Sequence, residues 1–295
     1  REAQKLLDKA FYDYDGHNHD LGFMWELSSG ADYRLTGNKD ARRTMLYAAN
    51  VLNGRYNISG SYIRAWPDHI GWSIIDCMMN LPLLYFASRE VDDPCFKYVG
   101  IAHADMTIRD HIRPDGSVIH IVSHDPVTGE VIETKGGQGM ADGSSWSRGQ
   151  AWALYGFVLS YIHTGKQEYL DVAKKVAHYF VSNVCDDWLP KCDFRAPQEP
   201  VIYDSTAGAI AACGLIEIAN RVPEFEKDLY LKPAIKMLQA MDEKFCDWDE
   251  NHDGILQMGT EDYLREEGRH KYIVYGDYYF AEALYKLRGN KELFW

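Results

Sequence analysis

The chain has 295 residues, of which 46% are hydrophobic and 25% charged, proportions that are ordinary for a globular protein with a sizeable core. Its formal net charge of −13 argues against a nucleic-acid partner, and no apolar run is long enough to span a bilayer, so no membrane-spanning segment is expected. Aromatic residues make up 13% of the chain, including 20 tyrosines and 8 tryptophans, which is more than packing alone usually requires. Carbohydrate-binding clefts are one common reason for such a surplus.

Helical periodicity dominates the chain from its first residues. The opening segment REAQKLLDKAFYDY has the apolar spacing of a helix and begins without a methionine, so we expect the natural protein to continue upstream. Strand-like alternation is confined to short pieces such as SVIHIVS at residues 117–123. The sequence therefore predicts an all-α fold.

Short joints recur between the predicted helices. Three are near-identical, TGNKDA from Thr36, TGKQEY from Thr164 and RGNKEL from Arg288, and two weaker ones lie near Asp92 and Val222. Their recurrence fits one helical hairpin per repeat. Five joints in a chain that we expect to be cut short at both ends predict six hairpins. The predicted architecture is an (α/α)6 barrel formed as a single domain over residues 1–295, and an open helical solenoid is the alternative.

The other end of each predicted hairpin carries a longer loop rich in polar and aromatic residues. These loops lie near residues 13–22, 54–72, 113–146, 186–206 and 248–276. Because short joints alternate with long loops, a closed ring would gather the long loops on one rim. Binding and catalytic residues are often held on such loops by a rigid scaffold, so we expect the functional site there.

Two acidic residues lie on these loops or beside them. Asp20 lies in GHNHDLGF, at the first long loop, and Asp76 lies in WPDHIGWSIIDCMMNLPLLYF, where apolar neighbours on both sides imply burial. Apolar surroundings favour the protonated form of a carboxyl group, which a general acid working near neutral pH requires. The alternative for Asp76 is a structural bond to a nearby helix terminus. Asp142 is expected to be a loop or capping residue.

The segment GSSWSRGQAWALYG runs from a Gly- and Ser-rich loop into a predicted helix that Ser144 or Ser145 would cap. It brings Trp146, Arg148 and Trp152 together, and the last two share a helix face because they are four residues apart. A guanidinium fork between two indoles suits a planar, anionic ring. The alternative is a buried tryptophan pair beside a surface arginine.

His120 ends the apolar piece SVIHI, and a lone histidine there is more often structural than catalytic. Asp204 precedes the apolar segment STAGAIAACGLIEIA and is expected to be its N-cap.

Signals for a metal or cofactor are weak, so neither is expected. DENHDG (Asp249–Gly254) matches the first half of a calcium loop, but Thr260 stands where a bidentate glutamate belongs. GGQG at Gly136 lacks the strand–turn–helix context of a phosphate loop. The six cysteines form no CxxC pair, and only Cys185 and Cys192 are close enough in sequence for a disulfide to be considered.

With these residues taken together, the chain resembles the unsaturated glucuronyl hydrolases of glycoside hydrolase family 88. The resemblance covers nearly the whole chain and is carried by HDLGF, DCMMNLPLLYFAS, GSSWSRGQAWALYG, YDSTAGAIAACGL and GDYYFAEAL. The related unsaturated rhamnogalacturonyl hydrolases of family 105 share the barrel and the acid pair but match the tryptophan block less well. The chain departs from the family at its ends: the family's first helix, where a stacking tryptophan is expected, is absent from this sequence, as is the tail that in some members contacts the next sugar.

The resemblance implies an (α/α)6 barrel that removes a 4,5-unsaturated uronic acid from the non-reducing end of lyase-generated oligosaccharides by hydrating the C4=C5 vinyl ether. Asp76 matches the general acid and base, and Asp20 the second essential acid. The residues that match the substrate-binding subsite are His120, Gln138, Trp146, Arg148, Trp152 and Tyr278. The implied partner is an unsaturated uronyl oligosaccharide, without a metal or cofactor, in the cytoplasm or periplasm of a bacterium.

Two further classes remain open at this stage. A non-catalytic glycan-binding barrel would account for the aromatic surplus, but it gains nothing from a buried acid such as Asp76. A sugar epimerase or isomerase on the same scaffold would be expected to use histidine as its acid and base and would leave the mass of its substrate unchanged.

Overall fold

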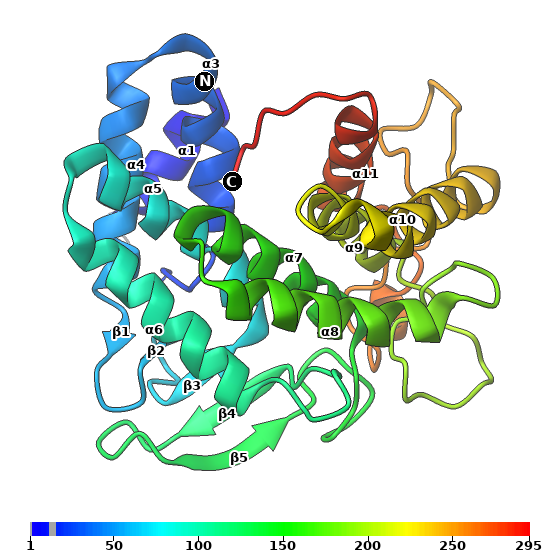
Figure 1. Cartoon of the computed structure of the whole chain (residues 1–295), viewed down its shortest axis with the longest axis horizontal. Helices are drawn as coiled ribbons and strands as arrows, with labels where there is room; N and C mark the ends of the chain where they lie inside the picture. The colour runs from blue at the N-terminus through cyan, green and yellow to red at the C-terminus, as the bar shows by residue number, and fades with distance from the viewer. Residues whose placement is uncertain (1, 12–15) are drawn as a thin grey trace.

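The computed structural model describes residues 2–11 and 16–295, and helices dominate it (Figure 1). Arg1 and part of the first predicted loop (12–15) lie outside the described residues. The α-helices are α1 (Glu2–Ala10), α2 (Leu21–Trp25), α3 (Ala31–Thr36), α4 (Lys39–Asn53), α5 (Leu81–Val91), α6 (Pro94–Asp110), α7 (Ser147–Thr164), α8 (Gln167–Val184), α9 (Ser205–Ala219), α10 (Glu224–Lys244) and α11 (Val274–Leu287). A π-helical turn η1 (Glu26–Gly30) joins α2 to α3, and two 3₁₀ turns are η2 (Ile75–Met79) and η3 (Glu266–Gly268). The predicted all-α class is confirmed.

Four of the five predicted short joints are confirmed as hairpin turns. Residues 37–38, 92–93, 165–166 and 220–223 connect α3 to α4, α5 to α6, α7 to α8 and α9 to α10, and the fifth joint follows α11. Gly37 and Gly165 end their helices in the left-handed region, with φ of 71° and 73°, a conformation that favours glycine.

Consecutive hairpins pack side by side to build the barrel wall. α5 packs against α7, α7 against α9 and α9 against α11, while α6, α8 and α10 each pack against their own hairpin partner. Every residue of α9 is buried, whereas α8 buries a single face, so α9 belongs to the inner layer and α8 to the outer one. The ring of Phe23 on α2 contacts the rings of Tyr275 and Tyr279 on α11, so α2, near the start of the chain, lies against α11, its last helix.

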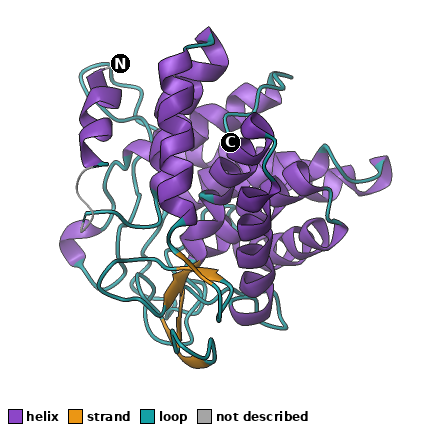
Figure 2. Cartoon of the chain, turned by 90° about the vertical axis from the view of Figure 1, so that its left-hand side faces the viewer, coloured by secondary structure: helices purple, strands orange, loops and turns teal. Residues whose placement is uncertain are grey.

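Five short strands lie together at one end of the helices (Figure 2). β1 (Tyr56–Asn57) pairs with β2 (Tyr62–Ile63), and β3 (Trp72–Ile74), β4 (Ile121–His124) and β5 (Val131–Lys135) form an antiparallel sheet in which β4 is central. These strands belong to two of the predicted long loops, and β4 covers the end of the strand-like piece SVIHIVS. In the part of the chain that the structure describes, no helix is both long and apolar enough to cross a membrane.

Candidate active site

A cavity of about 200 Å³ opens among the helix starts and long loops at one end of the barrel. Its lining comes from four separate parts of the chain: Asp20, Phe23, Asp76, Met79, Gln138, Trp146, Arg148, Trp152 and Tyr275. Pockets for drug-sized ligands usually measure about 300–1,000 Å³, so this smaller cavity suits one sugar ring. The structure therefore brings together the predicted site residues apart from His120 and Tyr278.

Asp76 lies on η2, directly after strand β3, with 19% of its side chain exposed. The neighbouring Ile75, Cys77 and Met78 are buried, whereas Asp76, for which the sequence predicted burial, is only partly buried. Its atom Oδ2 is itself buried and lies 3.4 Å from Nε2 of His120. Asp76 thus presents a carboxyl group to the cavity with one oxygen held against a histidine.

His120 lies behind the cavity wall, where its ring is 4.3 Å from that of Trp146. Its Nδ1 is 3.1 Å from the carbonyl oxygen of Gly136 and 3.0 Å from the backbone N–H of Gln138, so this atom has both an acceptor and a donor within reach. Each neutral tautomer of the ring therefore has a partner at Nδ1. His120 can present either an N–H or a lone pair to Asp76, according to whether that carboxyl group is ionised.

Gly137 makes this close approach to His120 possible. Its φ is +57°, and a Cβ at this position would lie 2.1 Å from Nδ1 of His120. The glycine that appeared in the sequence as part of a weak phosphate motif therefore serves to fit the loop over the imidazole ring.

Asp20 begins α2, and its Oδ1 lies 3.1 Å from Nε2 of the buried His19. Burial raises the pKa of Asp20, but the charge and hydrogen bond of His19, together with Asn80 and Asn18, lower it further, so the net pKa lies below its usual value. Burial lowers the pKa of His19, and Asp20 raises it above the usual value. Both pKa shifts favour the charged form of their group, the carboxylate of Asp20 and the imidazolium of His19.

Asn80 connects the two segments that carry Asp20 and Asp76. Its side-chain oxygen accepts a hydrogen bond from the N–H of Phe23 at 2.7 Å, and its backbone packs so closely on α2 that a Cβ at Gly22 would lie 2.5 Å from its Cα. Asn80 directly follows η2, which carries Asp76. The glycine in the HDLGF motif thus lets the helix that begins at Asp20 lie against the turn that bears Asp76.

Replacing His19 is expected to move the acid limb of the pH–activity profile. Because His19 holds the pKa of Asp20 down while burial pushes it up, His19→Gln should raise that pKa. Turnover that depends on an ionised Asp20 would then fall at a higher pH than in the unsubstituted enzyme. The measurement is kcat between pH 3.5 and 7, with His69→Gln as the control, since His69 stacks on Trp72 instead. If the acid limb of the profile did not move in His19→Gln, turnover would not depend on an ionised Asp20.

Arg148 is buried, with 1% exposure, and its charge is compensated inside the protein. Its Nη1 donates to Oδ2 of Asp204 at 2.5 Å and to the carbonyl oxygen of Thr260 at 2.6 Å, and its Nη2 donates to the carbonyl oxygen of Glu261 at 2.9 Å. Burial lowers the pKa of Arg148, but Asp204 raises it more. Burial also raises the pKa of Asp204, against the effect of the arginine charge. The guanidinium lies 4.6 Å from the ring centroid of Trp146, a cation–π contact.

One capping prediction holds by position and the other is wrong. Asp204 is the N-cap residue of α9, as predicted, but its carboxylate is chiefly the counterion of Arg148. α7 begins at Ser147, and neither Ser144 nor Ser145 caps it: the Ser144 hydroxyl and the Ser145 N–H both donate to the carboxylate of Asp193.

Tyr275, and not the predicted Tyr278, lines the cavity. Both residues lie on α11, but Tyr278 packs against the rings of Tyr279 and Trp295. The ring centroid of Tyr275 lies 6.1 Å from that of Trp152 and 6.0 Å from the guanidinium carbon of Arg148. Tyr275 lies just before the GDYYFAEAL motif and was not among the predicted site residues.

Gln138 and the two indoles complete the lining. The amide Nε2 of Gln138 donates to the carbonyl oxygen of Glu261 at 2.5 Å. The indole N–H groups of Trp146 and Trp152 are buried and have no hydrogen-bond partner among the described residues. Buried donors are normally paired, so these two N–H groups are available to a ligand's oxygen atoms.

The calcium-like segment and the cysteine pair singled out in the sequence do not lie at this site. The described residues hold no group of three or more His, Cys, Asp or Glu side chains arranged to bind a metal. In the DENHDG segment, Oδ1 of Asp249 accepts hydrogen bonds from the backbone and side chain of Asn251, as in an ordinary turn. Cys185 is exposed and Cys192 buried, and both are free thiols.

Known proteins resemble this chain over most of its length. The unsaturated glucuronyl hydrolase of Bacillus sp. (strain GL1) is 36% identical over 287 residues, which cover 94% of this chain and 76% of that protein. The unsaturated chondroitin disaccharide hydrolase of Streptococcus pneumoniae is 33% identical over 305 residues, covering 100% of this chain and 76% of the relative. A solved structure of a UGL variant with dGlcA-Glc-Rha-Glc superposes with a TM-score of 0.91 at 35% identity, covering 97% of this chain and 80% of that one. No family profile matches the chain.

A helical barrel with two carboxyl groups and several aromatic rings around a sugar-sized cavity defines a glycoside hydrolase. The fold is the (α/α)6 barrel that the sequence predicted. Identity above 30% over three quarters of the curated relatives goes further: the chain belongs to the unsaturated glucuronyl hydrolases.

Proposed function

We propose that this enzyme removes a 4,5-unsaturated uronic acid from the non-reducing end of lyase-generated oligosaccharides by hydrating the C4=C5 double bond, with Asp76 as the proton donor. The observation that carries the proposal is the contact between Asp76 and His120 at the wall of the cavity. A vinyl ether needs one positioned acid that can give up a proton and recover it, and this pair supplies that acid.

The reaction begins with transfer of the Asp76 proton to C4, which leaves an oxocarbenium ion shared by C5 and the ring oxygen. A water molecule then adds to C5 and returns a proton to Asp76. The resulting hemiketal opens to a ketone at C5, and the hemiacetal left at C1 collapses to an aldehyde and releases the next sugar as an alcohol. Neither a nucleophile nor an acid at the glycosidic oxygen is required, unlike in the usual two-carboxylate mechanism.

His120 matches each protonation state of Asp76. While the carboxyl group is protonated, the ring can offer it the Nε2 lone pair and donate from Nδ1 to Gly136. Once the proton has left, the other tautomer offers an N–H to the carboxylate and accepts the Gln138 N–H at Nδ1. The ionised Asp20 in the same cavity stabilises the positive charge that develops on the sugar.

The aromatic walls and the buried cation define the binding subsite. Trp146, Trp152 and Tyr275 offer ring faces and indole N–H groups to a flat, partly unsaturated sugar ring. Three hydrogen bonds of Arg148 are already made within the protein and Asp204 compensates its charge, so the predicted contact with the uronate carboxylate relies on its remaining N–H donors.

A panel of unsaturated disaccharides tests this function. The panel would include chondroitin, hyaluronan and heparin products of differing sulfation together with an unsaturated rhamnogalacturonan disaccharide, followed by loss of alkene absorbance. Turnover of glucuronyl disaccharides is expected. Turnover of the rhamnogalacturonan product alone would favour the family 105 type of activity, and binding without turnover would point to a glycan-binding protein.

A further inference from the structure

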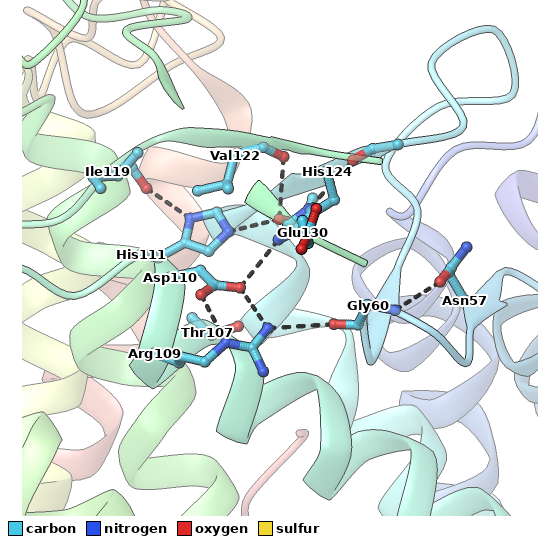
Figure 3. A network of polar contacts seen from close by, with 12 residues as sticks. Asn57, Gly60, Thr107, Arg109, Asp110, His111, Ile119, Val122, His124 and Glu130 are labelled. Atoms are coloured by element: carbon cyan, nitrogen blue, oxygen red, sulfur yellow. Dashed lines mark hydrogen bonds and ion pairs between the residues drawn. The ribbon is translucent and has the colours of Figure 1, made fainter. Parts of the chain in front are cut away.

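A buried histidine joins strand β3, which leads to Asp76, to the segment before β4 that carries His120. His111 follows the last residue of α6, and its side chain is fully buried behind the sheet of β3, β4 and β5 (Figure 3). Its Nε2 lies 2.8 Å from the hydroxyl oxygen of Ser73 on β3, and its Nδ1 lies 2.8 Å from the carbonyl oxygen of Ile119. One imidazole ring therefore bridges both segments.

The hydrogen-bond partners of His111 determine which of its ring nitrogens carries the hydrogen. A carbonyl oxygen can only accept, so Nδ1 carries the hydrogen that faces Ile119. Nε2 is then the lone pair, and the Ser73 hydroxyl donates to it. Burial lowers the pKa of His111 to about 4, with smaller effects from Ile119, His124 and Asp110, so the neutral ring is the form present near neutral pH.

The bridged residues are close neighbours of the reacting pair. Ser73 lies three residues before Asp76, and Ile119 directly precedes His120. Next to the paired strands β3 and β4, the N–H of Ile75 donates a hydrogen bond to the carbonyl oxygen of His120 at 3.0 Å. The offset of these two segments therefore decides how far Oδ2 of Asp76 lies from Nε2 of His120.

We propose that His111, acting through Ser73 and Ile119, is a positioning residue that holds Asp76 and His120 in register for proton transfer, a role that rests on the proposed function of that pair. His111 does not touch the cavity. It keeps one hydrogen bond to Ser73 and one to Ile119, so that the carboxyl group of Asp76 and the imidazole of His120 stay in contact through the reaction.

His103 provides a matched comparison. It lies on α6, which His111 directly follows, is fully buried, and accepts a hydrogen bond from the N–H of Ile63 on β2 at 3.0 Å. It has the same residue type and burial, but it holds β2, which carries neither Asp76 nor His120. A merely structural role for buried histidines would make His103 and His111 equivalent.

The kinetic experiment compares Ser73→Ala, His111→Asn and their double variant with His103→Gln, each assayed well below its own melting temperature. Asparagine retains a donor where Nδ1 stood and loses the bond to Ser73. We expect kcat to fall by about 10- to 100-fold in both single variants, with KM within about twofold, since a small misplacement of reacting groups has effects of this size. The double variant should be no slower than the singles, because both remove the same link. His103→Gln should lower the melting temperature and keep kcat.

A crystal structure of Ser73→Ala gives a readout that does not depend on any substrate. The distance from Asp76 Oδ2 to His120 Nε2 should exceed the 3.4 Å of the unsubstituted enzyme. An unchanged distance, unchanged kcat in Ser73→Ala, or an equal loss of kcat in His103→Gln would each overturn the proposal. If the unsubstituted enzyme turned over no unsaturated disaccharide, the proposed function would fail, and this distance would still decide whether His111 positions the pair.

Discussion

Replacing Asp76 with asparagine is expected to lower kcat by about 10²–10⁴-fold, the usual contribution of a positioned general acid and base. Asparagine keeps the shape of the side chain and a contact with His120, but it has no proton to deliver to C4 and cannot recover one from water. Because Asp76 acts on the reacting carbon and the aromatic walls hold the sugar, KM should change little.

The control for this prediction is Asp105→Asn on the outer helix α6. Asp105 accepts hydrogen bonds from Lys166 and Tyr169 and lies outside the lining of the cavity. Its replacement should leave kcat unchanged. If Asp76→Asn turned over an unsaturated uronide nearly as fast as the unsubstituted enzyme, Asp76 would not be the proton donor.

Replacing Asp204 with alanine is expected to lower the free energy of unfolding by about 3–5 kcal/mol, the cost of leaving a buried charge without its partner. Arg148 would remain in the core with only the carbonyl oxygens of Thr260 and Glu261 to accept its hydrogen bonds. The measurement is urea unfolding followed by circular dichroism.

An exposed ion pair gives the matched control for Asp204. Asp228 and Lys232 are 2.8 Å apart on the surface of α10, and Asp228→Ala should cost less than about 1 kcal/mol. The double variant Arg148→Met/Asp204→Ala should regain part of the stability, because it removes the unpaired charge. Equal losses in Asp204→Ala and Asp228→Ala would show that the buried pair is not a stabilising unit.

Local signals in the sequence predicted the helical hairpins and several residues of the cavity, whereas the family resemblance was needed to favour a closed barrel over an open solenoid. Gly37 and Gly165 mark hairpin turns because a left-handed residue after a helix is a local requirement. Asp76 stood out because apolar residues flank it on both sides. Such features depend on a few neighbouring residues, so periodicity and turn chemistry expose them.

Long-range pairings escaped prediction for a physical reason. Asp204 has the local context of a helix cap, and its actual partner Arg148 is 56 positions away. Ser144 and Ser145 precede a helix, yet the Ser144 hydroxyl and the Ser145 N–H donate their hydrogen bonds to Asp193 on another loop. No local pattern records which distant group competes for a side chain. Tyr275 went unpredicted because which tyrosine of α11 faces the cavity depends on the rotation of that helix, which no local pattern records.

Deuterium transfer from heavy water tests the central claim most directly, because hydration of the double bond protonates C4 whereas ordinary glycoside hydrolysis never does. A single turnover of an unsaturated disaccharide in heavy water, quenched at once, should give a keto acid that carries one deuterium at C4, detected by NMR. Keto acid made in ordinary water and then held in heavy water for the same time is the control for exchange beside the ketone. Cleavage of the disaccharide with no deuterium at C4 would contradict the vinyl-ether mechanism and, with it, the role of Asp76.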